Sequence, residues 1–102
     1  DQLNYILGRN ALNQCYITGY GTKPVMHPHH RPSEADGIEA PVPGMLSGGP
    51  NSGRQDAVAE NKIAEGTPPA KCYIDDVGSY STNEIAIYWN SPAVFVAAYF
   101  DR

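Results

Sequence analysis

The sequence has few basic residues, no long apolar run and little cysteine, and each shortage excludes a class of protein. Only seven lysines and arginines are scattered along 102 residues, and the formal net charge is −4. No basic stripe is present to meet a phosphate backbone, which argues against nucleic acid as a partner. The longest apolar run, PAVFVAAYF from residue 92 to 100, is too short to span a bilayer, so we expect no membrane partner.

Cysteine and targeting signals are equally sparse. Cys15 and Cys72 can form one pair at most, which is not a disulfide framework, and we expect two buried thiols. The opening DQLNYILGRN has neither a charged leader nor a cleavage site, so any export signal is expected outside these residues. The length allows one small domain or a piece of a larger one.

Helix patterns occur near the two ends. Leu3, Ile6 and Leu7 follow helical spacing and predict a helix over about 1–8. The stretch STNE, residues 81–84, has the form of a capping box and predicts a helix over about 82–90, with Glu84 bonded to the backbone of Ser81. Pro92 should interrupt that helix and begin a closing one over about 92–100.

The segment from residue 19 to 72 is predicted to be a long loop region. It holds eight of the nine prolines and eight of the ten glycines, with one weak helical candidate at 54–64. A loop of this length is uncommon in a compact domain unless it carries function. The sequence therefore predicts a mainly α protein with long loops, and too little apolar surface to be a complete fold by itself.

Three histidines lie within four positions of the stretch MHPHHRPSEAD, residues 26–36. His27, His29 and His30 could be zinc ligands, but no second cluster of cysteine or histidine supplies the remaining ligands. A solvated loop is the plainer interpretation. Arg31 favours a binding role, because its planar fork of donors suits hydroxyl or carboxylate oxygens. A histidine and an arginine separated by one residue could thus hold a polar ligand.

Carboxylates and aromatic rings gather in CYIDDVGSYSTNEIAIYWNS, residues 72–91. A turn accounts for Asp75 and Asp76, and the capping box accounts for Glu84, without any catalysis. The alternative is a glycosidase site, where rings such as Tyr80 stack on sugar faces and a carboxylic acid protonates the leaving oxygen. The residues alone leave both interpretations open.

Two segments carry a resemblance to glycoside hydrolase family 9, the cellulase and endoglucanase family. CYITGYGTKPVMHPHHR, residues 15–31, looks like the family's histidine motif, although Cys15 stands where the motif usually has serine, threonine or valine. YIDDVGSYSTNEIAIYWNS, residues 73–91, matches the second signature at every fixed position: Tyr73, Asp75, Tyr80, Glu84, Ala86, Asn90 and Ser91. LSGGPNS at 46–52 and YILGRNALN at 5–13 also resemble that family, so the match covers nearly the whole chain.

The resemblance implies a role for each matching residue in hydrolysis of β-1,4-glucans such as cellulose. Glu84 would be the general acid, with Asp75 orienting its partners or lying next to the sugar. His29 and Arg31 would hold sugar hydroxyls at the cleavage point, and Tyr80 would contact the substrate. The mechanism would be inverting, with two carboxyl groups about 6.5–9.5 Å apart.

The resemblance also implies what surrounds this chain. Residues 1–102 would form the C-terminal segment of the catalytic domain, an (α/α)6 barrel, and the enzyme would be secreted. The base would come from an Asp-Ala-Gly-Asp type motif that these residues lack, so we predict that the chain needs the remainder of the catalytic domain as its partner and is inactive alone.

Two other interpretations remain. A non-catalytic carbohydrate-binding module would explain the aromatic residues, but such modules are usually β-sandwiches and alternating strand patterns are nearly absent here. No cofactor is expected, although a structural calcium ion could use Asp36 and Glu39 as oxygen ligands. An Asp-Gly pair is far more often a turn.

Overall fold

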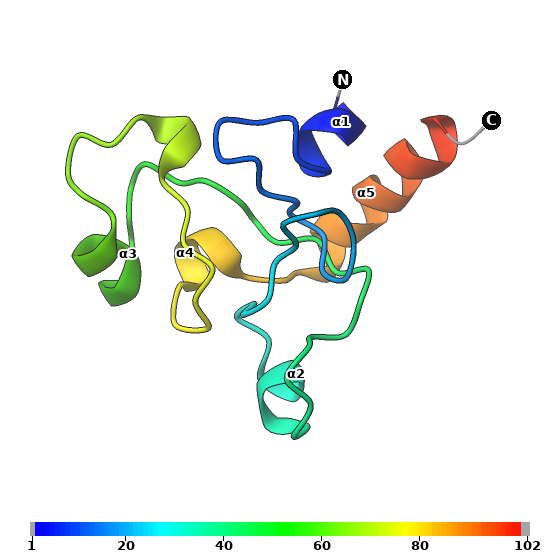
Figure 1. The fold of residues 1–102 in the computed structure, drawn as a ribbon, viewed down its shortest axis with the longest axis horizontal. Helices are drawn as coiled ribbons and strands as arrows, with labels where there is room; N and C mark the ends of the chain where they lie inside the picture. Colours follow the sequence, from blue (N-terminus) through cyan, green and yellow to red (C-terminus); the bar gives the residue numbers. More distant parts are fainter. Residues whose placement is uncertain (1, 101–102) are drawn as a thin grey trace.

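The computed structural model describes residues 2–100, and this part of the chain is helical with long connecting loops (Figure 1). The elements in that range are α1 (Gln2–Ile6), α2 (Arg31–Ala35), α3 (Ala57–Lys62), the 3-10 helix η1 (Pro69–Lys71), α4 (Tyr80–Asn83) and α5 (Ile87–Phe100). Only α5, with 14 residues, is longer than two turns. The predicted mainly α class with long loops is confirmed.

Loops, rather than helices, form the centre of the molecule. No sheet occurs between residues 2 and 100, but four isolated bridges join Cys15 to Pro24, Ile17 to Leu46, His29 to Glu84 and Ser47 to Ile85. These bridges bring the loops at 15–29 and 46–48 against the segment that leads from α4 to α5. Positions far apart in sequence are therefore held together by a few backbone contacts.

The buried residues of this centre are largely polar. Thr18, Ser79, Thr82 and Asn83 are fully buried. Buried polar groups need hydrogen-bond partners, and loop backbone supplies many of them, as when Thr18 Oγ1 donates to the carbonyl of Val42. A small apolar cluster of Ala59, Ile63 and Cys72, flanked by Ile74, packs beneath α3. The fold thus depends on hydrogen bonds more than on a large apolar core.

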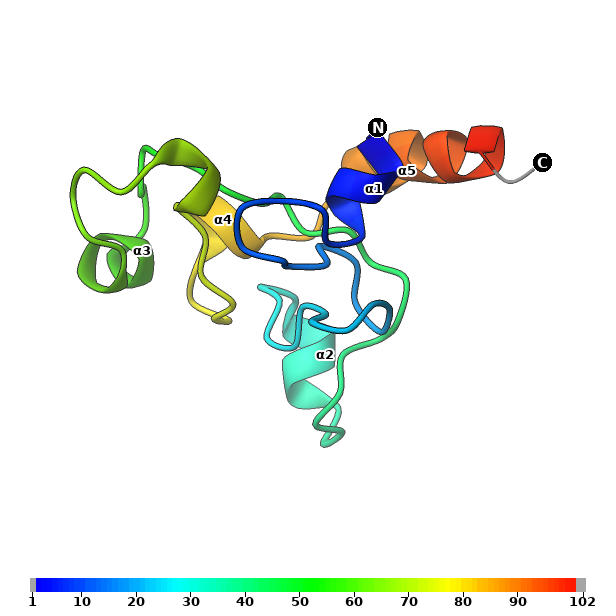
Figure 2. The ribbon, with the colours of Figure 1, turned by 45° about the horizontal axis from the view of Figure 1, so that its top comes forward.

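Helices α2 and α5 project in different directions from this centre. In Figure 1, α2 extends downward and α5 runs away toward the C-terminus, and the tilted view in Figure 2 shows α1 lying over the first part of α5. Contact between α1 and α5 is the main packing of one helix on another in the described chain. Much of the surface of α5 is therefore left uncovered.

The prediction that Pro92 separates two helices is wrong. The expected helices over 82–90 and 92–100 are replaced by the short α4, a link at 84–86 and a continuous α5 with Pro92 inside it. Pro92 is the sixth residue of α5, and the helix continues through it although Pro92 has no N–H to donate to the Tyr88 carbonyl and its ring crowds that carbonyl. The predicted helix over 1–8 corresponds to α1, which ends at Ile6.

The capping box predicted at 81–84 is also wrong. Ser81 lies inside α4, and Glu84 follows it as the C-cap in extended conformation, with φ −72° and ψ 145°. The Ser81 N–H donates to the carboxylate of Asp56, at 2.9 Å, and not to Glu84. A distant carboxylate has therefore taken the place that the local pattern assigned to Glu84.

The region at 19–72 is not free of helix. The weak candidate at 54–64 contains α3, and α2 was not expected; its second residue, Pro32, is tolerated because the first turn of a helix has unpaired N–H groups in any case. Cys15 and Cys72 are free and buried, as predicted. No helix within residues 2–100 is long and apolar enough to cross a membrane.

Candidate active site

The loop at residues 26–31, which carries the three histidines and is called the histidine loop from here on, meets the segment around α4 at the centre of the molecule. The N–H of His29 donates to the carbonyl of Asn83 at 2.9 Å, which sets His29 in a parallel bridge with Glu84. These positions are 54 or more residues apart in sequence. The structure therefore brings together two of the residues that the two motifs single out.

Asp75 joins the two segments through its carboxylate. Oδ2 accepts the N–H of Met26 at 2.7 Å, and Oδ1 accepts the N–H of His27 at 2.8 Å and the amide of Asn83 at 3.1 Å. A carboxylate with three N–H donors is well satisfied and rigid. Its contacts are with backbone and amide groups, which suits a residue that positions the histidine loop.

Asn83 completes this junction and was not predicted from the sequence. Its side chain is fully buried, donates to the carbonyl of His27 at 2.7 Å and accepts the hydroxyl of Tyr73 at 2.6 Å. Burial, and then the negative charge of Asp75, raise the pKa of Tyr73 well above its usual range, so this phenol stays protonated and keeps donating. Asn83 directly precedes Glu84, so this buried network fixes the backbone at the start of Glu84.

The His29 ring is oriented by a hydrogen bond on one of its two nitrogens. Nδ1 lies 2.6 Å from the carbonyl of Val77. Because a carbonyl only accepts, Nδ1 carries the hydrogen and donates it. Nε2 is then left for another partner. The ring of Tyr80 lies 6.1 Å away, centroid to centroid.

Glu84 is held by its backbone and has an exposed side chain. Its carbonyl accepts the N–H of Gly48 at 3.0 Å, and the Trp89 ring packs so closely on Gly48 that an added Cβ would lie 3.2 Å from it. Within the described part of the chain, no hydrogen bond reaches the Glu84 carboxylate, which is therefore available to a ligand. Tyr80 is half exposed, at 52%, and its hydroxyl donates to the carbonyl of Gln55 at 2.9 Å.

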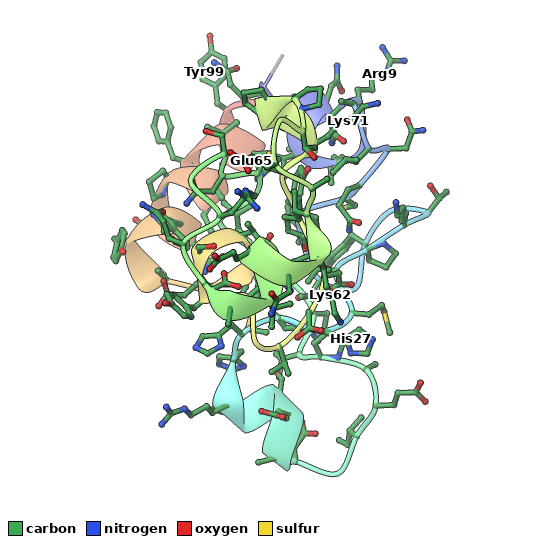
Figure 3. The ribbon with its side chains drawn as sticks, turned by 90° about the vertical axis from the view of Figure 1, so that its left-hand side faces the viewer. Arg9, His27, Lys62, Glu65, Lys71 and Tyr99 are labelled. Atoms are coloured by element: carbon green, nitrogen blue, oxygen red, sulfur yellow. The ribbon has the colours of Figure 1, made fainter. Side chains whose placement is uncertain are left out.

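The other polar residues of the histidine loop lie at its edge. Arg31 begins α2 with an exposed side chain, and among residues 2–100 no hydrogen bond or ion pair joins it to His29 or Glu84. His30 precedes α2, and its Nδ1 lies 2.7 Å from the hydroxyl of Ser33. His27 is exposed on the side seen in Figure 3 and lines a hollow of about 240 Å³ between the histidine loop and α2.

No group of three or more histidine, cysteine, aspartate or glutamate residues in the described part of the chain is arranged to hold a metal ion. The candidate calcium ligands Asp36 and Glu39 belong to no such group. Asp36 accepts the N–H of Ile38 at 2.8 Å, which is the contact of a turn, and Glu39 is exposed. The zinc and calcium alternatives therefore gain no support from the geometry.

Asp56 is the second residue of this region that sequence reasoning missed. It is 3% exposed, and its carboxylate accepts hydrogen bonds from Ala59, Ser79 and Ser81. Burial alone would raise the pKa of Asp56, but the hydrogen bonds from Ser81, Ala59 and Ser79 outweigh it and lower that pKa. An aspartate before an apolar helix is a readable N-cap signal, whereas its bonds to residues 79 and 81 are not visible in sequence.

The site thus holds an exposed carboxyl on Glu84, whose backbone is bridged to that of His29, and a Tyr80 ring near the His29 ring. Comparison with known proteins identifies the family. The model of glycosyl hydrolase family 9 matches residues 1–97. The chain belongs to this family.

Among its relatives, a cellodextrinase of Butyrivibrio fibrisolvens is 55% identical over 91% of this chain and 17% of its own length. A cellulose 1,4-β-cellobiosidase of Acetivibrio thermocellus is 47% identical over the whole chain and 12% of its own length. A thermostable endoglucanase variant of Alicyclobacillus acidocaldarius has a similar structure, with a TM-score of 0.90 at 58% identity, over 92% of this chain and 18% of that one.

The chain thus spans less than a fifth of the length of these relatives. Its fold is that of a part of the family's (α/α)6 barrel, as the resemblance implied. The absence of a sheet among residues 2–100 argues against a β-sandwich binding module.

Proposed function

We propose that this chain is the C-terminal part of the catalytic domain of a secreted glycoside hydrolase that cleaves β-1,4-glucans by inversion. The named activities of its relatives, cellodextrinase and cellobiosidase, support a glucan substrate. The observation that carries the proposal is the exposed carboxyl of Glu84, a residue whose backbone is bridged to that of His29. We call the longer polypeptide that would contain this chain the parent enzyme, and its other helices are the proposed partner of α5.

In this proposal Glu84 is the general acid. Its carboxyl gives a proton to the glycosidic oxygen as the bond from that oxygen to the anomeric carbon breaks. A base elsewhere in the parent enzyme takes a proton from water, which attacks the anomeric carbon from the opposite face. His29 and Arg31 hold sugar hydroxyls, with Nε2 of His29 as the available nitrogen. Tyr80 stacks on a sugar ring.

Asp75 acts in this scheme as a positioning residue rather than as an acid or base. Its two oxygens hold the N–H groups of Met26 and His27. The histidine loop therefore keeps one shape while substrate binds, which lowers the entropy cost of binding. No cofactor or metal has a role in the proposed reaction.

Replacement of the acid tests the proposal. Glu84→Gln in the parent enzyme should lower kcat on cellotetraose by about 10²–10⁴-fold, the usual contribution of general acid catalysis, while cellotetraose still binds. Glu65→Gln, which removes a carboxyl from an exposed loop residue labelled in Figure 3, is the matched control and should leave kcat unchanged. If Glu84→Gln keeps most of its activity, the acid assignment is wrong.

The isolated 102-residue chain should release no reducing sugar in the same assay, because it lacks the base.

A further inference from the structure

One carboxylate caps two helices. Oδ1 of Asp56 accepts the N–H of Ala59 at 2.7 Å, which makes Asp56 the N-cap of α3. Oδ2 accepts the N–H of Ser81 at 2.9 Å, in the first turn of α4, together with the hydroxyls of Ser79 at 3.0 Å and Ser81 at 2.5 Å. The first N–H groups of a helix have no partner inside it, and here one aspartate serves two such ends.

The loop at 51–56 holds α4 at two further points. The carbonyl of Gln55 accepts the hydroxyl of Tyr80, and the amide of Asn51 donates to the carbonyl of Ser81 at 3.2 Å. Residues 51–56 thus form hydrogen bonds with the side chain of Tyr80, the backbone of Ser81 and the hydroxyls of Ser79 and Ser81. Helix α4 cannot shift without breaking several of these hydrogen bonds.

Helix α4 needs these hydrogen bonds to be stable, and its position in turn determines the position of Glu84. Four residues make little more than one turn, and a helix of that length is not stable on its own. The Asn83 N–H donates to the carbonyl of Ser79 at 2.8 Å, and Glu84 is the next residue. The position of the Glu84 backbone therefore depends on where the first turn of α4 is held.

We propose that Asp56 is a positioning residue, which through α4 sets the place of Glu84 for proton transfer to the leaving oxygen. This proposal rests on the proposed function of Glu84. Asp56 itself touches no substrate. Its near-complete burial and four hydrogen bonds suit a fixed, ionised anchor, because a buried carboxylate is costly unless it is fully hydrogen-bonded.

The test compares two substrates of the parent enzyme. Cellotetraose has a sugar leaving group that needs a proton from the acid, whereas 2,4-dinitrophenyl β-cellobioside has a phenolate that leaves without one. Asp56→Asn keeps the size of the side chain and removes its charge. We expect kcat on cellotetraose to fall by about 10–100-fold, the range for a small misplacement of a reacting group, with KM little changed. On the dinitrophenyl substrate we expect less than a threefold loss, a margin we set at about assay error.

Controls separate this role from general loss of structure. Glu60→Gln removes a carboxyl from an exposed position on α3 and should leave both substrates unaffected. Ser81→Ala removes one of the hydroxyl donors to Asp56 and should show the same selective loss at smaller size. It carries the test if Asp56→Asn does not fold.

Each outcome decides the matter. Selective loss on cellotetraose in Asp56→Asn, or in Ser81→Ala, supports the proposal. Equal loss on both substrates, or no loss, overturns it. Glu84→Gln is the reference: if it shows the selective pattern and the Asp56 and Ser81 variants do not, the positioning role fails alone, whereas if Glu84→Gln loses nothing, the proposed function fails.

Discussion

Residues 75–84 and helix α5 follow one another along the chain, and they are surrounded in opposite ways. Ser79, Thr82 and Asn83 are completely buried although they are polar. Val94 and Phe95 in α5 are apolar and about 70% exposed, at 69% and 72%. The first segment is enclosed by other parts of the described chain, whereas α5 is in contact with α1 and the loop at 46–48 and keeps apolar side chains such as these exposed.

The difference indicates where the packing contacts of each segment come from. The region of the candidate site is held by loops of this chain, above all by Asp56, Asp75 and Asn83. Helix α5 is apolar on all sides, which is typical of a helix buried in a larger protein. An apolar hollow of about 420 Å³ lies between α1, α5 and the loops near residues 17–20 and 44–46. In the proposed parent enzyme, neighbouring barrel helices cover this surface.

The largest effect on stability is expected from a substitution in α5. Phe95→Ala should lower the free energy of unfolding of the parent enzyme by about 3–5 kcal/mol, because it would leave a cavity in a covered interface. Ile38→Ala, at a 65% exposed position on a loop, is the control and should change it by about 0.5 kcal/mol or less. Urea unfolding measures both. Equal, small effects would mean that α5 stays uncovered in the parent enzyme.

The second expected effect concerns the polar side. Asn83→Ala removes the donor to the His27 carbonyl and the acceptor of the Tyr73 hydroxyl. We expect a loss of about 1–3 kcal/mol in the free energy of unfolding, the cost of buried groups left without partners. Asn61→Ala, at an exposed position on α3, is the matched control. A loss no greater than that of the control would show that water replaces the Asn83 contacts.

Sequence motifs singled out residues that the structure brings together, but they did not reveal the contacts that hold those residues in place. His29, Tyr80 and Glu84 belong to two recognisable motifs, and the structure places His29 against both of the others. The capping box failed because a local pattern cannot reveal a competitor distant in sequence: Asp56 takes the Ser81 N–H from 25 residues away. The same limit hid Asn83, whose contacts span 56 positions.

The prediction that Pro92 separates two helices was wrong for a related reason. Pro92 disfavours a continuous helix locally, but apolar residues on both sides of it favour one long element that can pack against neighbours. The side-chain oxygen of Asn90 also accepts the N–H of Leu46 at 2.8 Å, which fixes the start of α5 to a loop 44 residues away. Tertiary contacts of this kind override local preference.

The smallest expected effect belongs to a charge at the edge of the polar region. The pKa of Asp76 is lowered, first by the N–H of Gly78 and then by the ammonium group of Lys62, which lies 3.2 Å from its carboxylate. A lowered pKa means that this contribution to stability is fully present above the ordinary value of 3.8 and is lost as the pH falls through the lowered pKa of Asp76.

Asp76→Asn should therefore destabilise the parent enzyme by no more than about 1 kcal/mol at pH 7, because the Lys62 side chain is 57% exposed and solvent screens the pair. The asparagine oxygen still accepts the Gly78 N–H, so the turn at residues 76–78 is kept. As the pH falls from 7 through the lowered pKa of Asp76, the difference between the variant and the unchanged enzyme in urea unfolding should shrink. A loss at pH 7 as large as that of Asn83→Ala would contradict this ranking, since it would mean that the partly exposed charge of Asp76 stabilises the protein as strongly as the buried amide of Asn83.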